Sequence, residues 1–282
     1  MAVIVRAYAK INWGLDITGR RADGYHLLDM VMQTIDLSDE LVIEPAAALS
    51  LTVDGVPAGE DNLVLRAARA LNRRTGRGDG ARMALAKRIP ARAGLGGGSA
   101  DCAAALTALN RLWGLGLGLG ELAEVGLSLG ADVPFCLAGG LARVSGIGER
   151  IEPVPDAPEI PLALVVPGGG LSTGEVFARW DRGYPGVGLD SRMLAEAVAA
   201  GDLTGAARLA VNALSAPAMS LLPQIGELIE RMRSLGAAAA FMTGSGSAVV
   251  GAFKTPSQAR RAAAEIPGAI LSRTLSGLPE MA

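Results

Sequence analysis

The sequence predicts an α+β fold in two domains, and three observations support this prediction. Strand-like segments precede amphipathic helical stretches in the first half of the chain. The second half closes with the order strand, glycine loop, strand, helix, strand. Between the halves, residues 153–158 contain three prolines and interrupt both periodicities, which marks a candidate linker. We therefore expect an N-terminal domain over residues 1–155 and a C-terminal domain over residues 156–282.

The N-terminal half begins with short strands. Strand-like segments occupy residues 3–9, 31–35, 41–43 and 49–53, and the turn residues Asp54-Gly55 close the last of them. Asp61 or Asn62 can cap a helix that runs to about Arg74 and exits at Gly76. A short alternating strand at residues 83–85 precedes a glycine-rich run.

The clearest helix of the chain follows that glycine-rich run. Its apolar residues recur at helical spacing and form one stripe: Cys102, Ala105, Leu106, Leu109, Leu112 and Trp113. A shorter helix is predicted at about residues 121–129, with Gly130 as its stop. Residues 131–135 have the form of the entry to one more short helix.

The C-terminal half is predicted to mix strands and helices. Residues 162–166 form a buried strand, and Ser172-x-x-Glu175 has the form of a capping box, so a helix should start there. Two or three helices follow between residues 191 and 235. The best of them has one apolar face: Leu221, Leu222, Ile225, Leu228, Ile229 and Met232. The uncharged stretch over residues 235–253 has a glycine-serine centre, which favours strand, loop and strand over a membrane span.

Composition limits the function classes. Half of the 282 residues are hydrophobic, 19% are charged and the net charge is −2, which indicates a compact globular protein and argues against a nucleic-acid-coating surface. The two cysteines, Cys102 and Cys136, provide neither a disulfide framework nor zinc-ligand spacing, and they fit the reducing cytoplasm. The N-terminal apolar run is too short to predict a signal peptide. We expect a small-molecule ligand rather than nucleic acid or membrane, and the oligomeric state stays open.

The run Gly94–Asp101 predicts an anion site. Four glycines in five positions let the backbone approach a ligand closely, and a helix beginning at Ser99 would direct unpaired N–H groups at it. Phosphate is the natural occupant of such a place. The run is neither a Walker A loop nor a good dinucleotide fingerprint. The alternative is a simple turn, because glycine makes up 38 of the 282 residues.

Three separated segments together resemble one family. In chain order they are Ala7–Asn12, Pro90–Asp101 and Thr243–Ser247. They are similar to the GHMP kinases, small-molecule kinases named for galactose, homoserine, mevalonate and phosphomevalonate. The resemblance implies a two-domain fold with an N-terminal, ATP-binding domain like the second domain of a small-subunit ribosomal protein. It also implies a ferredoxin-like C-terminal domain, with the active site in the cleft between the two.

Further motifs resemble one branch of that family. They are Arg21-x-Asp23-Gly24-Tyr25-His26, Asp61–Leu63, Leu129–Phe135, and Thr173 followed by Phe177. The resemblance implies transfer of phosphate from ATP to the 2-hydroxyl of a cytidine diphosphate adduct of methylerythritol, a step toward isoprenoid precursors. Alternatives are a homoserine or mevalonate kinase, or a non-catalytic nucleotide-binding relative. An RNA-binding module has only fold analogy in its favour.

The resemblance assigns the catalytic roles to Lys10 and Asp132. Asp132 would take or orient the proton of the attacking hydroxyl, and Lys10 would hold Asp132 ionised and stabilise charge on the transferred group. Each residue also has a simpler interpretation. A lysine at a strand end is usually solvated, and an aspartate before Val133-Pro134 can be only a helix N-cap.

The phosphate loop and its flanks would bind ATP. The residues concerned are Pro90, Ala91, Arg92, Ala93, Gly94, Leu95, Gly96, Gly97, Gly98 and Ser99. Asn62 would reach the nucleotide or only cap its helix. Mg²⁺ is expected because ATP phosphates need neutralising, with Ser99 as a candidate ligand. Ala100 departs from the family pattern, which usually has a small polar residue there, so a side-chain contact from that position is in doubt.

The remaining candidates would bind the second substrate. The resemblance implies that Tyr25 and Phe177 stack on the cytosine while His26 hydrogen-bonds the edge of the base. Asn12 and Thr173 would lie near the erythritol and the diphosphate. The second glycine loop, including Gly244 and Ser245, would approach the substrate, or would only form a tight hairpin. For Phe177 the alternative is core packing, and for His26 it is a loop position without a ligand.

Overall fold

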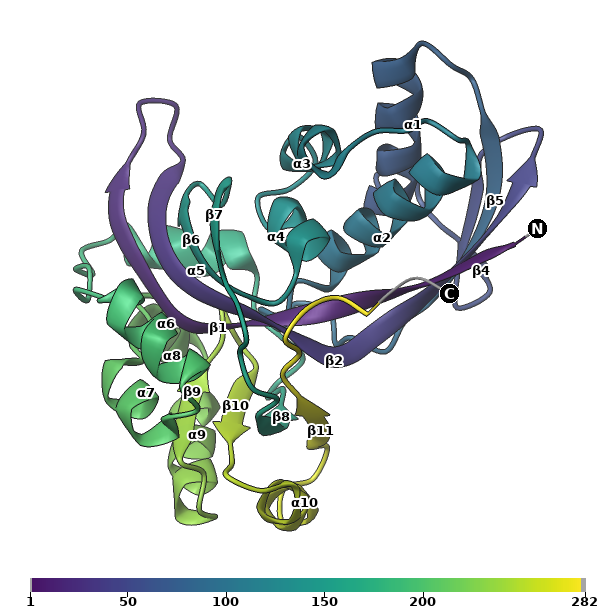
Figure 1. The fold of residues 1–282 in the computed structure, drawn as a ribbon. Helices are drawn as coiled ribbons and strands as arrows, with labels where there is room; N and C mark the ends of the chain where they lie inside the picture. The colour runs from purple at the N-terminus through teal and green to yellow at the C-terminus, as the bar shows by residue number, and fades with distance from the viewer. Residues whose placement is uncertain (1, 280–282) are drawn as a thin grey trace.

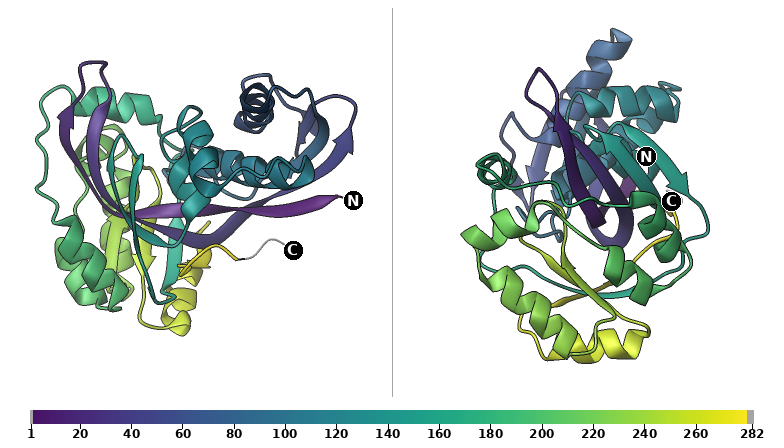
Figure 2. Two further views of the ribbon diagram at one scale, coloured as in Figure 1. Left: turned by 45° about the horizontal axis from the view of Figure 1, so that its top comes forward. Right: turned by 90° about the vertical axis from the view of Figure 1, so that its left-hand side faces the viewer.

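The computed structural model describes residues 2–279, and it confirms the α+β expectation. Within those residues the main strands form a larger, mostly antiparallel sheet and a smaller antiparallel sheet. Helices α1–α4 lie on one side of a long ribbon made by β1 and β2, and the smaller sheet with α7, α9 and α10 lies on the other (Figures 1 and 2).

The larger sheet is built around that ribbon. Its strands are β1 (Val3–Arg20), β2 (His26–Ala46), β3 (Ser50–Val53), β4 (Val56–Pro57), β5 (Gly80–Ala86), β6 (Leu141–Gly146) and β7 (Arg150–Val154). The order is β4-β3-β5-β2-β6-β7, and β1 pairs with β2. Register shifts in the β1–β2 pair at Tyr8/Lys10 and Asn12/Gly14 bracket the segment from Lys10 to Asn12. Such irregularities bend a strand and redirect its side chains.

The ribbon corrects the prediction of short N-terminal strands. The segments expected at residues 3–9, 31–35 and 41–43 are parts of two continuous strands, β1 and β2. In the sequence, polar residues such as Asp36 and Asp39 indicate the end of a strand, but in the structure each has partners elsewhere in the fold. Asp36 accepts hydrogen bonds from Ser272 and from the backbone of Arg273, and Asp39 pairs with Lys87. Long-range pairing therefore lets polar residues stay within the strand.

Four helices follow in the N-terminal half of the described chain. They are α1 (Leu63–Thr75), α2 (Gly97–Leu112), α3 (Leu119–Leu127) and α4 (Val133–Ala138). The expected caps of α1 are confirmed, since the Asn62 side chain accepts from the Val64 N–H and Gly76 adopts the left-handed conformation that ends the helix. Helix α2 begins at Gly97, two residues before the predicted start at Ser99. Helix α3 ends two residues earlier than predicted.

The smaller sheet has the strand order β11-β8-β10-β9. Its strands are β8 (Pro161–Val165), β9 (Ala239–Met242), β10 (Val249–Ala252) and β11 (Ile270–Arg273). Helices α5–α9 connect the first two strands and α10 (Pro256–Ala264) connects the last two. In order of appearance the strands therefore lie 4-1-3-2, all antiparallel to their neighbours, which is the expected ferredoxin-like topology.

The helices of this half differ from the prediction in number and in one cap. They are α5 (Thr173–Trp180), α6 (Ser191–Ala199), α7 (Leu203–Leu209), α8 (Ser215–Leu221) and α9 (Gln224–Ser234). Four of them, not two or three, lie between residues 191 and 235, because the predicted apolar face is split at Pro223. Helix α5 starts as predicted, but the Ser172 side chain makes no capping hydrogen bond, so the prediction of a capping box is wrong.

The proline-rich segment is only partly a connection. Pro153 and Val154 belong to β7, so the interruption predicted from residue 153 begins after the strand, at a turn where Asp156 has a positive φ of 57°. Isolated bridges connect the larger sheet to the C-terminal half: Leu15 of β1 pairs with Asn212, between α7 and α8, and Ile35 of β2 pairs with Thr274, directly after β11. The division at residue 155 stays a prediction. No helix among residues 2–279 is both long and apolar enough to cross a membrane.

Candidate active site

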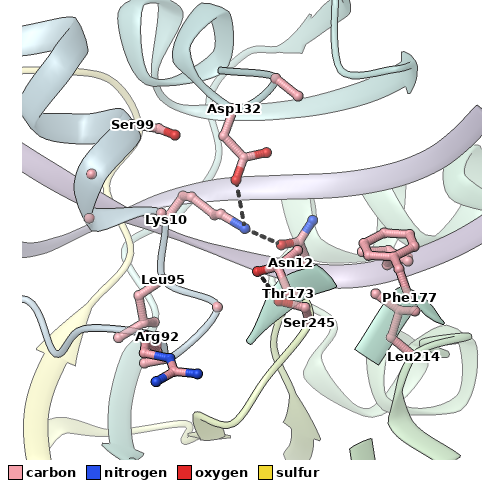
Figure 3. Close-up of a pocket in the computed structure, with 18 of the residues that line it drawn as sticks. Lys10, Asn12, Arg92, Leu95, Ser99, Asp132, Thr173, Phe177, Leu214 and Ser245 are labelled. Atoms are coloured by element: carbon pink, nitrogen blue, oxygen red, sulfur yellow. Dashed lines mark hydrogen bonds and ion pairs between the residues drawn. The ribbon is translucent and has the colours of Figure 1, made fainter. Parts of the chain in front are cut away.

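A cavity of about 930 Å³ opens beside the ribbon, and both glycine loops reach it. This volume lies within the range typical of small-molecule sites. Figure 3 shows its centre, where side chains from β1, α2, α5 and the loops converge. The sequence-predicted residues that line it are Lys10, Asn12, Tyr25, His26, Pro90 through Ser99, Asp132, Thr173, Phe177, Gly244 and Ser245. Segments more than 200 residues apart thus share one cavity.

Lys10 is the buried cation at the centre of this cavity. Lys10 is only 4% exposed. Its Nζ lies 2.7 Å from Asn12 Oδ1 and 3.4 Å from Asp132 Oδ2 (Figure 3). Lys10 and Asn12 are two apart on β1 and therefore face the same side. A buried ammonium needs such partners, because desolvation penalises an unpaired charge. The solvated-lysine interpretation is therefore wrong.

Asp132 lies at the N-terminal end of α4. It occupies the N-cap position, but its side chain makes no capping hydrogen bond. The carboxylate is directed to Lys10 instead, and about one third of the side chain remains exposed. A partly exposed carboxylate beside a buried ammonium is accessible to a ligand in the cavity, so helix capping alone does not account for its position.

The first glycine loop presents the start of α2 to the cavity. Gly96 is the N-cap with φ 71°, and no side chain caps the helix. The N–H groups of Gly97, Gly98 and Ser99 therefore begin the helix without intrahelical acceptors, at the positive end of its dipole. The backbone is fixed to β1, because Lys10 N–H donates to Leu95 O at 3.0 Å. Free N–H donors at a helix N-terminus are suited to an anion, so this geometry supports the prediction of a phosphate site.

The second glycine loop, residues 243–248, packs against the first. A Cβ on Gly94 would lie 2.3 Å from Thr243 O, and one on Gly244 would lie 2.8 Å from Gly94 O. The Asn12 N–H donates to Thr243 Oγ1 at 2.7 Å, and Thr173 Oγ1 lies 2.9 Å from Ser245 Oγ. The loop also closes an antiparallel hairpin, because β9 pairs with β10 and the Thr243 N–H donates to Ala248 O at 3.0 Å. The hairpin interpretation is therefore confirmed, and the same loop lines the cavity.

The other end of the cavity is aromatic. Tyr25 is 59% exposed, and the His26 ring lies 4.8 Å from the Phe177 ring, centroid to centroid. His26 Nε2 is 2.9 Å from Asp181 Oδ1. Phe177 also packs against the core cluster around the smaller sheet, so cavity lining and core packing both apply to it. His26 is therefore held in the cavity wall rather than being an isolated loop residue.

A buried charge network lies behind the phosphate loop, and no pattern in the sequence predicts it. Lys87 Nζ pairs with Asp39 Oδ2 and lies 2.6 Å from Asp101 Oδ2, and Asp39 Oδ1 accepts from the Ile89 N–H at 2.8 Å. Burial raises the pKa of Asp101 to about 7, although Lys87 opposes that rise. Burial alone would lower the pKa of Lys87, but the carboxylates of Asp101 and Asp39 outweigh that effect and raise it. The network joins β2, the phosphate loop and α2.

Three other predicted features have plain outcomes. Asn62 caps α1 and is absent from the cavity lining, which favours its structural alternative. Both cysteines are free and buried, and burial raises the pKa of the Cys102 thiol to about 12, so neither is an activated nucleophile.

Within residues 2–279 no group of three or more His, Cys, Asp or Glu side chains is placed to hold a metal. The Ser99 hydroxyl and the Asp132 carboxylate are oxygen donors of the kind Mg²⁺ prefers.

Comparison with known proteins identifies similar families and folds. The family model of the GHMP kinases N terminal domain matches residues 62–140, and that of the GHMP kinases C terminal matches residues 194–270. A 4-diphosphocytidyl-2-C-methyl-D-erythritol kinase of Pelotomaculum thermopropionicum is 42% identical, covering 94% of this chain and 93% of the relative. A kinase of the same name from Granulibacter bethesdensis is 44% identical, covering 91% and 87%.

Solved structures extend the similarity to three dimensions. A crystal structure of 4-(cytidine 5'-diphospho)-2C-methyl-D-erythritol kinase matches with a TM-score of 0.83 and 38% identity, over 96% of this chain and 98% of that chain. A homoserine kinase from Cytophaga hutchinsonii matches with a TM-score of 0.68 at 16% identity, over 98% and 95%. The second match supports the fold alone.

Proposed function

The chain belongs to the GHMP kinase family, and we propose that it transfers the γ-phosphoryl group of ATP to the 2-hydroxyl of 4-diphosphocytidyl-2-C-methyl-D-erythritol. The products are ADP and the 2-phosphate, in the route to isoprenoid precursors. The observation that carries the assignment is the meeting of Lys10, Asp132 and the phosphate loop in one cavity. We place the reaction in the cytoplasm, which suits a chain whose two cysteines are free and buried.

Asp132 and Lys10 act on the attacking hydroxyl. A hydroxyl bound next to Asp132 can donate a hydrogen bond to its carboxylate, which accepts the proton as the new O–P bond forms. The Lys10 ammonium, 3.4 Å from that carboxylate, pairs with it and stabilises negative charge on the transferred group. Asn12 holds the ammonium in place through its 2.7 Å hydrogen bond.

The phosphate loop binds the ATP phosphates. The free N–H groups at the start of α2 donate to phosphate oxygens, and the helix dipole favours their charge. Phosphoryl transfer requires positioning and charge neutralisation more than covalent help from the protein. Mg²⁺ supplies further neutralisation when bound, with Ser99 and Asp132 as the oxygen donors that this chain offers.

The aromatic end binds the cytidine. Tyr25 and Phe177 offer flat faces for stacking, and His26 offers a ring nitrogen to the edge of the base. Thr173 and Ser245, joined by a 2.9 Å hydrogen bond, lie between this end and Lys10 and suit the diphosphate or the erythritol (Figure 3). In this arrangement the two substrates occupy opposite ends of the cavity, and their reacting groups meet at Lys10.

Transfer of label tests this function. Purified protein is incubated with γ-labelled ATP and the cytidylylated methylerythritol, and the position of the label is determined. We expect label at the 2-position. Homoserine and mevalonate serve as alternative acceptors, and transfer to either one without transfer to the cytidine compound would replace the assigned substrate. Nucleotide binding without transfer to any acceptor would indicate a non-catalytic relative.

A further inference from the structure

We propose that Asp181 is a positioning residue that fixes the tautomer of His26, so that the site accepts cytosine and rejects uracil. This inference rests on the proposed binding of cytidine at the aromatic end. Asp181 is the C-cap residue of α5, and His26 is the first residue of β2. The fold brings these two positions together from 155 residues apart.

The hydrogen bond determines where the imidazole carries its proton. His26 Nε2 lies 2.9 Å from Asp181 Oδ1. An ionised carboxylate only accepts hydrogen bonds, so Nε2 must be the protonated nitrogen. Arg20 Nη1 lies 3.8 Å from the other carboxylate oxygen and is a second cationic neighbour of Asp181. In the neutral ring, Nδ1 is then left with a lone pair.

The ring is also held in place by its neighbours. The Phe177 ring lies 4.8 Å away in a tilted arrangement, and the Trp180 ring lies 5.6 Å away, edge-on. Only 13% of the His26 side chain is exposed. Within residues 2–279 no hydrogen bond reaches His26 Nδ1, although the residue lines the cavity. Nδ1 is therefore an unused acceptor on a fixed ring.

A fixed acceptor distinguishes the two pyrimidines. Cytosine carries an amino group at C4, which donates a hydrogen bond, whereas uracil carries a carbonyl oxygen there, which only accepts. The Nδ1 lone pair can accept from the cytosine amine, but it repels the uracil oxygen. A site built around one hydrogen bond rejects the ligand that lacks its partner. Without Asp181 the ring can move its proton to Nδ1 and donate to uracil instead.

Nuclear magnetic resonance tests the tautomer directly, because His26 is the only histidine of the chain. In ¹⁵N-labelled wild-type protein without ligand, at a pH where the ring is neutral, we expect the Nε2–H form to dominate. Asp181→Ala should populate the Nδ1–H form. Glu175→Ala, which removes an exposed carboxylate from the same helix, should leave the spectrum unchanged. A wild-type ring protonated at Nδ1 would overturn the proposal without reference to any variant.

Competition with CDP and UDP tests the selection. We expect wild-type protein to bind CDP at least about tenfold more tightly than UDP, and Asp181→Ala to narrow that ratio to about twofold. The kcat of Asp181→Ala at saturating substrate should stay near wild type while its KM rises. If wild type transfers label and binds CDP but Asp181→Ala keeps the wild-type ratio, the inference fails alone. If wild type neither binds CDP nor transfers label, the proposed function fails with it.

Discussion

The two ends of the cavity are built differently. At the phosphate end the working groups are backbone N–H donors and a lysine that is only 4% exposed, and the two glycine loops contact each other through their backbones. At the aromatic end Tyr25 is 59% exposed, and the proposed cytidine contacts come from side chains on separate elements. The first arrangement is built from backbone and a buried charge, whereas the second is built from side chains, of which Tyr25 is exposed and the His26 ring is held by its neighbours.

This difference predicts which kinetic quantity each end controls. Preorganised charge acts on the transition state, so losing it lowers kcat. Stacking faces bind the ground state and the transition state alike, so losing one raises KM and leaves kcat nearly unchanged. The variants below test whether the two ends separate in this way.

Replacing the buried ammonium should have the largest effect. We expect Lys10→Ala to lower kcat by about 10³-fold, because both the neutralising charge and the partner of Asp132 are lost. Binding of a non-hydrolysable ATP analogue, measured by calorimetry, should change by less than about fivefold, since the helix N-terminus remains. Wild-type turnover in this variant would contradict the role given to Lys10.

Altering the cradle should have the next largest effect. Gly96 has φ 71°, and a Cβ there would lie 3.0 Å from Lys10 Cγ and Cε. The left-handed conformation costs an ordinary residue about 1–2 kcal/mol. We expect Gly96→Ala to lower kcat/KM for ATP by about 10–100-fold. Gly78→Ala is the matched control, because nothing lies within 4 Å of that Cβ. Equal kinetics in the two variants would show that the loop geometry is not needed.

Removing a stacking face should act on affinity. We expect Phe177→Ala to raise the KM for the cytidine substrate by about tenfold, since an aromatic pair contributes about 0.5–1.5 kcal/mol beyond burial. The kcat and the KM for ATP should stay within about twofold. Phe177→Tyr retains the ring and serves as the control. A fall in kcat with unchanged KM would remove the distinction between the two ends.

The charge network behind the loop should affect pH-dependent stability more than turnover. In the folded chain burial raises the pKa of Asp101 from 3.8 to about 7. The unfolded state therefore loses this proton first, and stability should fall as pH rises from about 4 to about 7. Denaturation by urea across this range measures the slope. Asp101→Asn should flatten it, and an unchanged slope in that variant would exclude Asp101 as its source.

The phosphate end was predictable because its signal is contiguous. Residues 94–99 carry both the glycines and the helix start in one run, and the structure differs mainly by beginning α2 at Gly97. The pairing of Lys10 with Asp132 was predictable only from the family resemblance. Nothing in local periodicity brings together residues 122 positions apart, but the pair lies 3.4 Å apart in the structure.

Single polar residues with distant partners were not predictable. Asp39, Asp101 and Asp181 each look like ordinary surface carboxylates in the sequence, yet Lys87 and His26 pair with them across the fold. The same reason explains the missed continuity of β2, where Asp36 and Asp39 lie inside one strand. Local patterns identify elements, whereas tertiary partners determine which polar residues those elements can include.

One experiment examines the meeting of both ends at the reacting hydroxyl. The single-turnover rate of phosphoryl transfer is measured for Asp132→Asn with both substrates saturating, together with the affinity for each. We expect the rate to fall by at least about 10²-fold while both affinities stay within about threefold, because the amide keeps the shape but cannot accept the proton. A wild-type rate, or a loss that comes entirely from weaker binding, would contradict the mechanism.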